Sequence, residues 1–156
     1  MDEHGLEIRG LRAGDAGRLR ELMSMAKGHW GYDPEWVREW TDAPGNFTLE
    51  LTPGAEVAVG ELDGRTVGWA QWMPRETIAW LEDLWVEPSA MGSGIGRALF
   101  DWCRDRAHAL GFRRLEWEAD PHAVGFYEKL GARYLRDSGN AELGRALPVM
   151  GIDVLD

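Results

Sequence analysis

The 156-residue sequence contains a single cysteine, Cys103, so a fold held together by intrachain disulfides is excluded. Cys103 falls among apolar residues spaced as on one face of a helix, which predicts a buried small side chain in a reducing compartment. No apolar run approaches the roughly 20 residues that span a membrane. The first five residues also lack the basic and apolar regions of a signal peptide. We therefore expect a cytoplasmic protein with no membrane partner.

Basic side chains are scarce, with 17 Lys and Arg against 27 Asp and Glu and a net charge of −10. Such a chain repels nucleic acid and anionic membranes unless it carries a local basic patch, and no basic stripe is seen. We expect no nucleic-acid partner, and an amine substrate is easier to accommodate than a carboxylate. Repeats and low-complexity segments are also absent, so residues 1–156 are expected to form one domain.

Glycine, proline and asparagine clusters divide the chain into short strands and helices. Asp63-Gly64 between two strand-like runs predicts a β-hairpin. The expected strands are 6–9, 47–51, 56–61, 66–72, 77–86, 114–119, 133–136 and 147–154. The expected helices begin after Asp15 and cover 35–40, 95–110 and 120–130, and a loop is expected at 138–145. This order predicts a mixed α/β sheet, antiparallel in its first half, with helices on both faces.

The most informative stretch runs from Trp80 to Leu110, where a strand is followed by a loop of small residues and then a helix. Glycines let the backbone approach a ligand, and the free amides at a helix N-terminus attract anions. A phosphate or pyrophosphate ligand is therefore expected. Arg97-Ala98 after Gly96 excludes a Walker loop, and the glycine spacing differs from the dinucleotide motif G-x-G-x-x-G.

Two motifs in this order resemble those of the GNAT N-acyltransferase superfamily. The loop through Gly94 and Gly96 is similar to the acyl-CoA loop R/Q-x-x-G-x-G/A, with Met91 at the Arg/Gln position. Residues 120–132 resemble N-x-x-A-x-x-F-Y-x-x-x-G-F, with Asp120 in place of Asn and Ala132 in place of the last Phe. The order of elements also looks like the GNAT fold, as in uncharacterised bacterial members of the family.

The resemblance implies transfer of an acetyl group from acetyl-CoA to a primary amine by direct attack, without a metal. By position, Tyr127 would be the general acid for the CoA sulfur; its other reading is an aromatic at the edge of the core. Backbone groups of Leu84, Trp85 and Val86 would pair with the pantetheine arm. The remaining residues expected to bind the co-substrate are Met91, Gly92, Ser93, Gly94, Ile95, Gly96, Arg97, Asp120 and Phe126.

Glu82 is the candidate base, acting directly or through water. It sits in a strand with apolar neighbours, so desolvation is expected to raise its pKa. Asp83 should project to the opposite face of the sheet unless a bulge intervenes. It is assigned, with His29, Trp30 and Tyr32, to the wall of the acceptor site, and it stays an alternative to Glu82 and to water as the base. Either carboxylate could instead pair with a nearby arginine.

Two other functions fit the same motifs. One is a CoA-binding sensor without catalysis, and the other is a modifier of charged RNA, which the acidic composition disfavours. The acceptor could be a small molecule or a peptide amine. The resemblance also allows a homodimer, although no surface pattern in the sequence specifies one.

Overall fold

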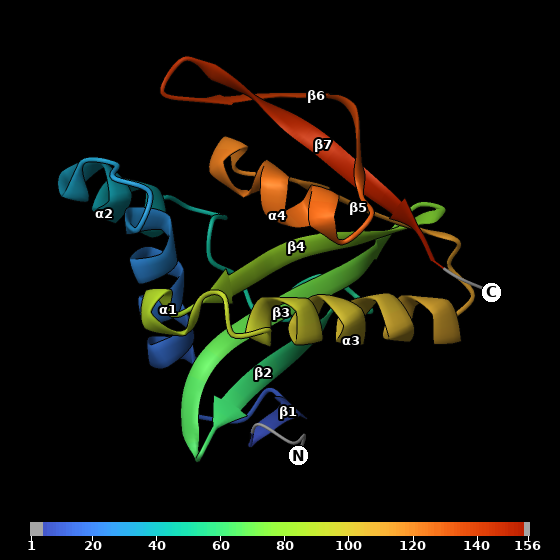
Figure 1. Ribbon diagram of the computed structural model, residues 1–156, viewed down its shortest axis with the longest axis horizontal. Helices are drawn as coiled ribbons and strands as arrows, with labels where there is room; N and C mark the ends of the chain where they lie inside the picture. The colour runs from blue at the N-terminus through green and yellow to red at the C-terminus, as the bar shows by residue number, and fades with distance from the viewer. Residues whose placement is uncertain (1–4, 155–156) are drawn as a thin grey trace.

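The computed structural model describes residues 5–154, within which seven strands form one mixed sheet (Figure 1). Across the sheet the strands lie in the order β1-β2-β3-β4-β5-β7-β6. The strands are β1 (Leu6–Gly10), β2 (Glu56–Leu62), β3 (Arg65–Arg75), β4 (Ile78–Val86), β5 (Arg114–Glu118), β6 (Arg133–Glu142) and β7 (Arg145–Asp153). The helices are α1 (Ala16–Gly28), α2 (Pro34–Asp42), α3 (Ile95–Ala109) and α4 (Val124–Lys129), with short 3-10 helices η1 (Pro88–Ala90) and η2 (Pro121–Ala123). The predicted mixed α/β sheet is confirmed.

The first four strands form an antiparallel meander, and β4 then pairs with β5 in parallel. The hairpin predicted at Asp63-Gly64 joins β2 to β3, and both residues have a positive φ, as a type I′ turn requires. Beyond β5, the last hairpin lies antiparallel, with β7 inserted between β5 and β6. The one parallel pair therefore stands in the middle of the sheet.

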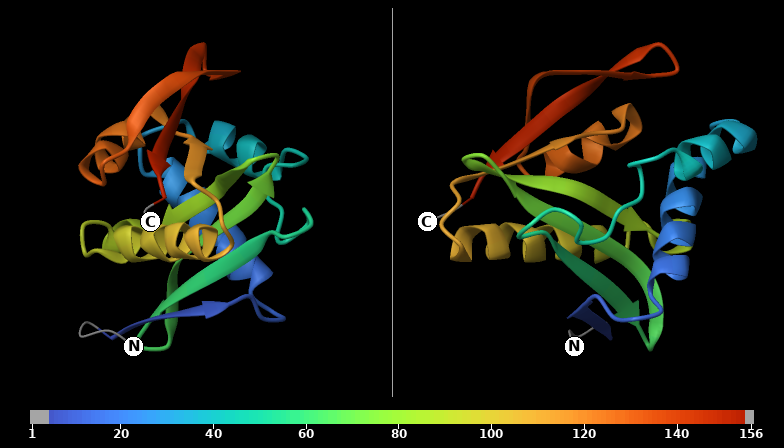
Figure 2. Two further views of the ribbon diagram at one scale, coloured as in Figure 1. Left: turned by 90° about the vertical axis from the view of Figure 1, so that its right-hand side faces the viewer. Right: turned by 180° about the vertical axis from the view of Figure 1, so that it is seen from behind.

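Helices cover both faces of the sheet, and each face has its own apolar core. Alternate residues of a strand point to opposite faces. Ala58 accordingly packs in the core that holds α3, while its neighbours Val57 and Val59 pack in the core that holds α1. Figure 1 shows α3 crossing in front of the sheet, and the view from behind in Figure 2 shows α1 on the other side. Cys103 is fully buried in the α3 core, as predicted.

The parallel pairing of β4 and β5 is very short. It joins only Ala79 to Leu115 and Trp80 to Glu116. Past these pairs the two strands diverge, while each keeps its other neighbour, β3 or β7. The sheet is therefore open between the second half of β4 and the end of β5.

Two sequence predictions of secondary structure are wrong. Residues 47–51 form bends rather than a strand. Here the side chain of Gln71 takes the place of a strand partner, donating to Thr48 O and accepting from Glu50 N. Glu50 also has a positive φ, which a regular strand excludes.

The loop predicted at 138–145 is instead the tip of the β6–β7 hairpin. Its two turn residues, Leu143 and Gly144, both have a positive φ. Leucine rarely adopts this conformation, so the sequence gives no turn signal. The expected helix at 120–130 begins as η2 and becomes α-helical only at Val124. None of the helices within residues 5–154 has the length and apolar character needed to cross a bilayer.

The close packing of α3 on the sheet gives a test of the fold. A Cβ atom added at Gly68 in β3 would lie 3.0 Å from Leu99 Cδ1 and 3.0 Å from the Trp85 carbonyl oxygen. Because a backbone carbonyl in a sheet cannot move aside, Gly68→Ala should lower the free energy of unfolding by about 1–3 kcal/mol. Urea unfolding measures this change. Gly10→Ala is the matched control, since its Cβ would meet nothing within 4 Å, and equal losses in the two variants would contradict the packing described.

Candidate active site

The loop between β4 and α3 has the geometry of an anion site. Gly92 and Gly94 have φ values of 84° and 90°, and Gly94 occupies the N-cap of α3. Residues with a side chain are strained at such angles, so glycine is needed here. A Cβ at either position would meet nothing within 4 Å, so the loop faces open space. The first intrahelical bond of α3 is that from Ala98 N to Gly94 O, so the amides before Ala98 have no partner within the helix and are available to an anion.

Beside this loop lies a cavity of about 450 Å³, here called the α3 cavity. It is bounded by the loop, by α4 and by the diverging part of β4. Most of the predicted site residues line it: Trp30, Glu82, Asp83, Leu84, Trp85, Val86, Met91, Gly92, Gly94, Gly96, Arg97, Asp120, Phe126 and Tyr127. Residues that lie far apart in the sequence are thus brought together.

Four predicted residues do not line the α3 cavity. The Ile95 side chain is buried in the core, and the Ser93 hydroxyl turns back to the Ala90 carbonyl. His29 packs edge-on against Trp30 with ring centroids 4.9 Å apart. Tyr32 also does not line the α3 cavity, but its hydroxyl donates a hydrogen bond to Asp120 at 3.0 Å.

Tyr127 is buried between the core and the α3 cavity. Its ring packs against Trp117, with centroids 4.8 Å apart, so the core fixes its position. Its hydroxyl has no hydrogen-bond partner among residues 5–154. Burial raises the pKa of Tyr127, with a further contribution from the negative charge of Asp120. The phenol therefore stays protonated and is free to donate a hydrogen bond.

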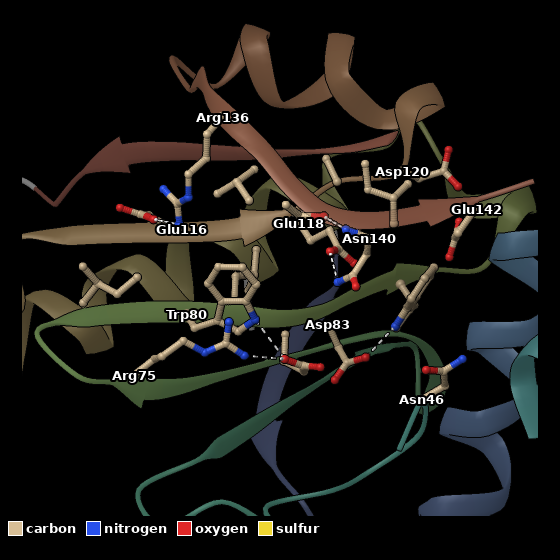
Figure 3. Close-up of a pocket in the computed structure, with 18 of the residues that line it drawn as sticks. Asn46, Arg75, Trp80, Asp83, Glu116, Glu118, Asp120, Arg136, Asn140 and Glu142 are labelled. Atoms are coloured by element: carbon tan, nitrogen blue, oxygen red, sulfur yellow. Dashed lines mark hydrogen bonds and ion pairs between the residues drawn. The ribbon is translucent and has the colours of Figure 1, made fainter. Parts of the chain in front are cut away.

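A second cavity, of about 650 Å³, lies between β4 and the β6–β7 hairpin and is called the hairpin cavity (Figure 3). Its walls carry seven carboxylates, Glu76, Glu82, Asp83, Glu116, Glu118, Asp120 and Glu142. Three basic residues, Lys27, Arg75 and Arg136, also line it. The two cavities share Leu81, Glu82, Asp83, Trp85, Glu118 and Asp120. They meet where β4 and β5 diverge, and four of the six shared residues are acidic.

A β-bulge sets the positions of Glu82 and Asp83. In the β3–β4 ladder Asp83 pairs with Gln71 and Leu81 pairs with Trp72, which leaves Glu82 as the extra residue. The bulge that could bring both carboxylates to one site is therefore present, and both residues line both cavities.

The expected desolvation of Glu82 is wrong, because Glu82 is exposed. Its carboxylate accepts a hydrogen bond from Trp80 Nε1 at 2.9 Å and lies 3.9 Å from Arg75. The buried carboxylate is instead that of Asp83, which is 5 % exposed. Burial raises the pKa of Asp83 to about 7, although hydrogen bonds from Trp85 and Gln71 oppose the shift. Asp83 is therefore the carboxylate that changes charge near neutral pH.

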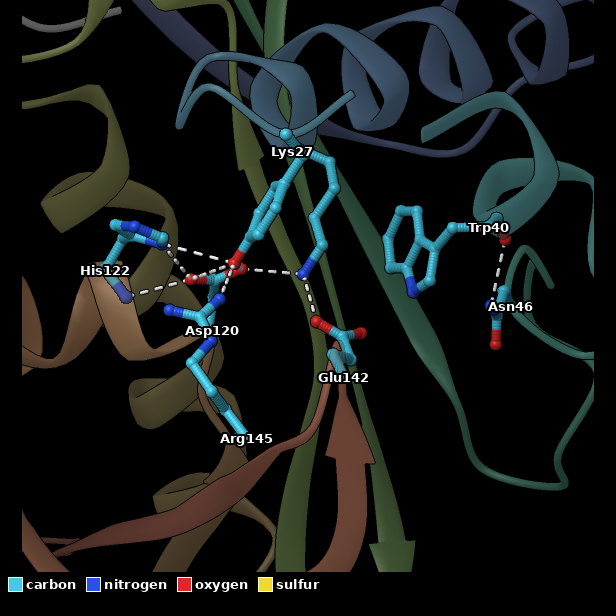
Figure 4. A network of polar contacts seen from close by, with 8 residues as sticks. Lys27, Trp40, Asn46, Asp120, His122, Glu142 and Arg145 are labelled. Carbon is cyan, nitrogen blue, oxygen red and sulfur yellow. Dashed lines mark hydrogen bonds and ion pairs between the residues drawn. The ribbon is translucent and has the colours of Figure 1, made fainter. Parts of the chain in front are cut away.

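A buried lysine joins three parts of the chain at the edge of the hairpin cavity (Figure 4). Lys27 Nζ lies 2.6 Å from Asp120 and 2.6 Å from Glu142, and its side chain is 3 % exposed. It also lies 4.9 Å from the centre of the Trp40 ring. Burial alone would raise the pKa of Asp120, but hydrogen bonds from Lys27 and from His122 N hold it below its usual value. The ion pairs connect α1 to the start of η2 and to the tip of the β6–β7 hairpin.

Three residues of the site, Lys27, Glu118 and Glu142, were not predicted from the sequence. Lys27 follows Leu19 and Met23 at four-residue spacing, so it lies on the apolar face of α1. A lysine on such a face predicts a buried charge with partners, and this signal was available. Glu118 is the middle one of three acidic residues at alternate positions 116, 118 and 120, and alternation along a strand places them on one face. Glu142 gave no signal, because the strand that carries it was expected to be a loop.

The residues assembled here suit acyl transfer. Backbone amides and glycines can hold a phosphate-bearing ligand, and an unpartnered phenol lies further along the same cavity. At the shared end of the two cavities, carboxylates can attract and deprotonate an ammonium group. No group of three or more His, Cys, Asp or Glu side chains within residues 5–154 is arranged to hold a metal ion.

Comparison with known proteins agrees with this chemistry. The sequence model of the acetyltransferase (GNAT) family matches residues 18–132. No protein of curated function is similar enough in sequence to match. Among solved structures, the PaiA N-acetyltransferase from Thermoplasma acidophilum in complex with coenzyme A is 16% identical, with a TM-score of 0.79 over 95% of this chain and 98% of that one.

Two further structures share the fold. A GCN5-related N-acetyltransferase from Rhodopseudomonas palustris is 21% identical, with a TM-score of 0.79 over 98% of each chain. The ribosomal-protein-S18-alanine N-acetyltransferase from Escherichia coli is 18% identical, with a TM-score of 0.70 over 96% of this chain and 94% of that one. The GNAT fold predicted from the sequence is thereby confirmed.

The buried Asp83 gives a pH-dependent test. The folded protein keeps the Asp83 proton up to about pH 7, whereas an unfolded aspartate loses it near pH 3.9. Between these values the folded state binds more protons, so the contribution of Asp83 to stability falls as pH rises and levels off above pH 7. Asp83→Asn removes this loss, so the stability of the variant relative to the parent should rise from pH 4 to pH 7.

The change should be about 1.4 kcal/mol for each unit of pKa difference, measured by urea unfolding at several pH values. Asp105→Asn is the control, because Asp105 is exposed on α3 and lines neither cavity. If the relative stability of Asp83→Asn did not vary with pH, the buried carboxylate would not titrate as described.

Proposed function

Because this chain belongs to the acetyltransferase (GNAT) family, we propose that it transfers an acetyl group from acetyl-CoA to a primary amine by direct attack. The observation that carries this proposal is the meeting of two cavities at the opening between β4 and β5. One cavity has the features needed for a CoA ester, the other has an acidic wall suited to an amine, and they share one short boundary.

We place acetyl-CoA in the α3 cavity. Its pyrophosphate would accept hydrogen bonds from the first amides of α3, next to the open positions at Gly92 and Gly94. Its pantetheine arm would pair with the backbone from Leu84 to Val86 as an added strand, because β5 does not pair with this part of β4. One of the structures that share the fold holds coenzyme A.

The amine enters from the hairpin cavity and reacts at the shared boundary. Its nitrogen lone pair attacks the thioester carbonyl carbon, and the carbon–sulfur bond then breaks to give an amide and the CoA thiolate. A proton lost by the amine passes to a β4 carboxylate. The thiolate receives a proton from Tyr127, directly or through water. The β4 carboxylate then releases its proton to solvent and Tyr127 regains one from solvent, which returns both groups to their starting state.

Of the two β4 carboxylates, Asp83 fits the base better than Glu82. A general base works best when its pKa is near the working pH, and Asp83 has a pKa of about 7. Glu82 is exposed and attracts the incoming ammonium, and it can relay the proton through water. Placing both roles on adjacent residues depends on the bulge at Glu82.

Tyr127→Phe tests the role of the phenol in an assay of thiol release from acetyl-CoA with a panel of amines. The variant keeps the ring that packs on Trp117 and loses only the hydroxyl. We expect kcat to fall by about 10²-fold, the usual scale for general acid catalysis, with little change in KM for acetyl-CoA. Tyr134→Phe is the control, because Tyr134 is exposed on β6 and lines neither cavity.

The same assay distinguishes an acetyltransferase from a CoA-binding sensor without catalysis. If the Tyr127→Phe variant turned over acetyl-CoA at the parent rate, the Tyr127 hydroxyl would not be required for catalysis. A parent protein that binds CoA by calorimetry but acetylates no amine would overturn the proposed function and favour the sensor.

Cys103→Ala tests for a covalent intermediate. The thiol is fully buried in the α3 core and lines neither cavity. Burial also raises its pKa, so a nucleophilic thiolate is disfavoured. We expect kcat to be unchanged once circular dichroism shows that the variant is folded. Loss of turnover in a folded variant would contradict direct attack by the amine.

A further inference from the structure

We propose that the acceptor is a small aliphatic amine that carries a second positive charge and no carboxylate, such as a terminal diamine. This inference rests on the proposed N-acetyltransferase function and narrows its substrate class. Three observations support it: the excess of carboxylates in the hairpin cavity, the ion pairs that the basic residues of this cavity already form, and the binding of the Lys27 and Arg75 side chains to the cavity wall.

The basic residues of the hairpin cavity are already paired. Lys27 lies 2.6 Å from each of two carboxylates, Asp120 and Glu142. Arg136 lies 3.2 Å from Glu116, which is also held by Arg114 from outside the cavity. Lys27, buried between its two carboxylates, is therefore not free to receive the carboxylate of an acceptor, and Arg136 would have to leave Glu116 to do so.

Two carboxylates at the boundary between the two cavities have no cationic partner. Glu118 accepts a hydrogen bond from Asn140 Nδ2 at 2.8 Å, and Asp83 accepts from Gln71 and from Trp85, each at 2.9 Å. Among residues 5–154 neither has a Lys, Arg or His nitrogen within ion-pair distance. Both line the two cavities where these meet. Glu118 thus supplies uncompensated negative charge where the amine reacts, and Asp83 adds to it once it loses its proton near pH 7.

Two basic side chains of the protein, Arg75 and Lys27, are already bound to the wall of the hairpin cavity. The guanidinium of Arg75 lies 3.9 Å from the centre of the Trp80 ring and 3.9 Å from the Glu82 carboxylate. Lys27 sits between two carboxylates and the Trp40 ring, 4.9 Å from its centre. An aromatic face beside a carboxylate is a favourable site for an ammonium group. The Trp rings beside these carboxylates add cation–π attraction to the acidic charge, and both features favour the same ligand chemistry.

Size and charge then define the acceptor. A cavity of about 650 Å³ accommodates a small molecule. A carboxylate close to the reacting amine would face Glu118, and also Asp83 in its ionised form, in a partly desolvated space, where like charges repel strongly. An amine with one charge would leave part of the negative wall unpaired once it is deprotonated for attack. A second ammonium on the same molecule keeps that wall neutralised throughout the reaction.

Three amines with the same five-carbon chain test the inference in the thiol-release assay. Cadaverine has two amines, pentylamine lacks the second amine, and lysine adds a carboxylate to cadaverine. We expect kcat/KM for cadaverine to exceed that for each of the others by about tenfold or more, which corresponds to about 1.4 kcal/mol. The advantage should shrink as salt concentration rises, because salt screens charges.

Glu118→Gln removes the uncompensated charge and keeps the shape of the side chain. We expect the ratio of kcat/KM for cadaverine to that for pentylamine to fall by about fivefold or more, whereas Glu7→Gln should leave it unchanged. Glu7 is exposed on β1 at the edge of the sheet and lines neither cavity.

Turnover of lysine or pentylamine at least as efficient as that of cadaverine would overturn the inference while leaving the acetyltransferase function intact. An unchanged ratio in Glu118→Gln would also overturn it. Absence of turnover with all three amines and with the wider panel would instead mean that the proposed function itself fails.

Discussion

The early end of the pairing between β4 and β5 is the constraint on which the rest of the site depends. After two residue pairs the strands separate, although each remains fixed to the sheet on its other side. Because both sides of the opening are held by antiparallel ladders, the gap is part of the regular sheet structure. It lets a cavity beside α3 meet a cavity beneath the β6–β7 hairpin, so that two ligands can meet within the sheet.

The electrostatics of the site follow from that opening. Residues on the diverging strands lose a neighbouring strand, and polar side chains occupy the space. The bulge at Glu82 then places one carboxylate in water and the next, Asp83, in a buried position, so adjacent residues have different acidities. Lys27 balances two further carboxylates from other parts of the chain. Long-range ion pairs of this kind hold the hairpin over its cavity as well as setting the charge of the wall.

Local patterns in the sequence predicted the features that local chemistry determines. Glycine at 92 and 94 is required by backbone angles, and Asp63-Gly64 encodes its own turn, so the loop, the α3 start and the first hairpin were foreseen. The bulge depends on how β4 aligns with Gln71 on another strand, and no local pattern reports such a register. The segment at 47–51 has strand-like composition, but its backbone groups bond to that same glutamine. Leu143 turns the chain with an angle that leucine rarely adopts, so the last hairpin was hidden as well.

The opening in the sheet also has a consequence for solubility. Where β4 and β5 part, each exposes an unpaired strand edge inside the molecule, and unpaired edges are templates for strands of other chains. Three of the four carboxylates at the boundary of the two cavities belong to these strands: Glu82 and Asp83 to β4, and Glu118 to β5. Charged side chains on an edge discourage the addition of a foreign strand, which would have to bury them. The acidic residues that we assign to the acceptor therefore also protect the protein against aggregation through its own active site.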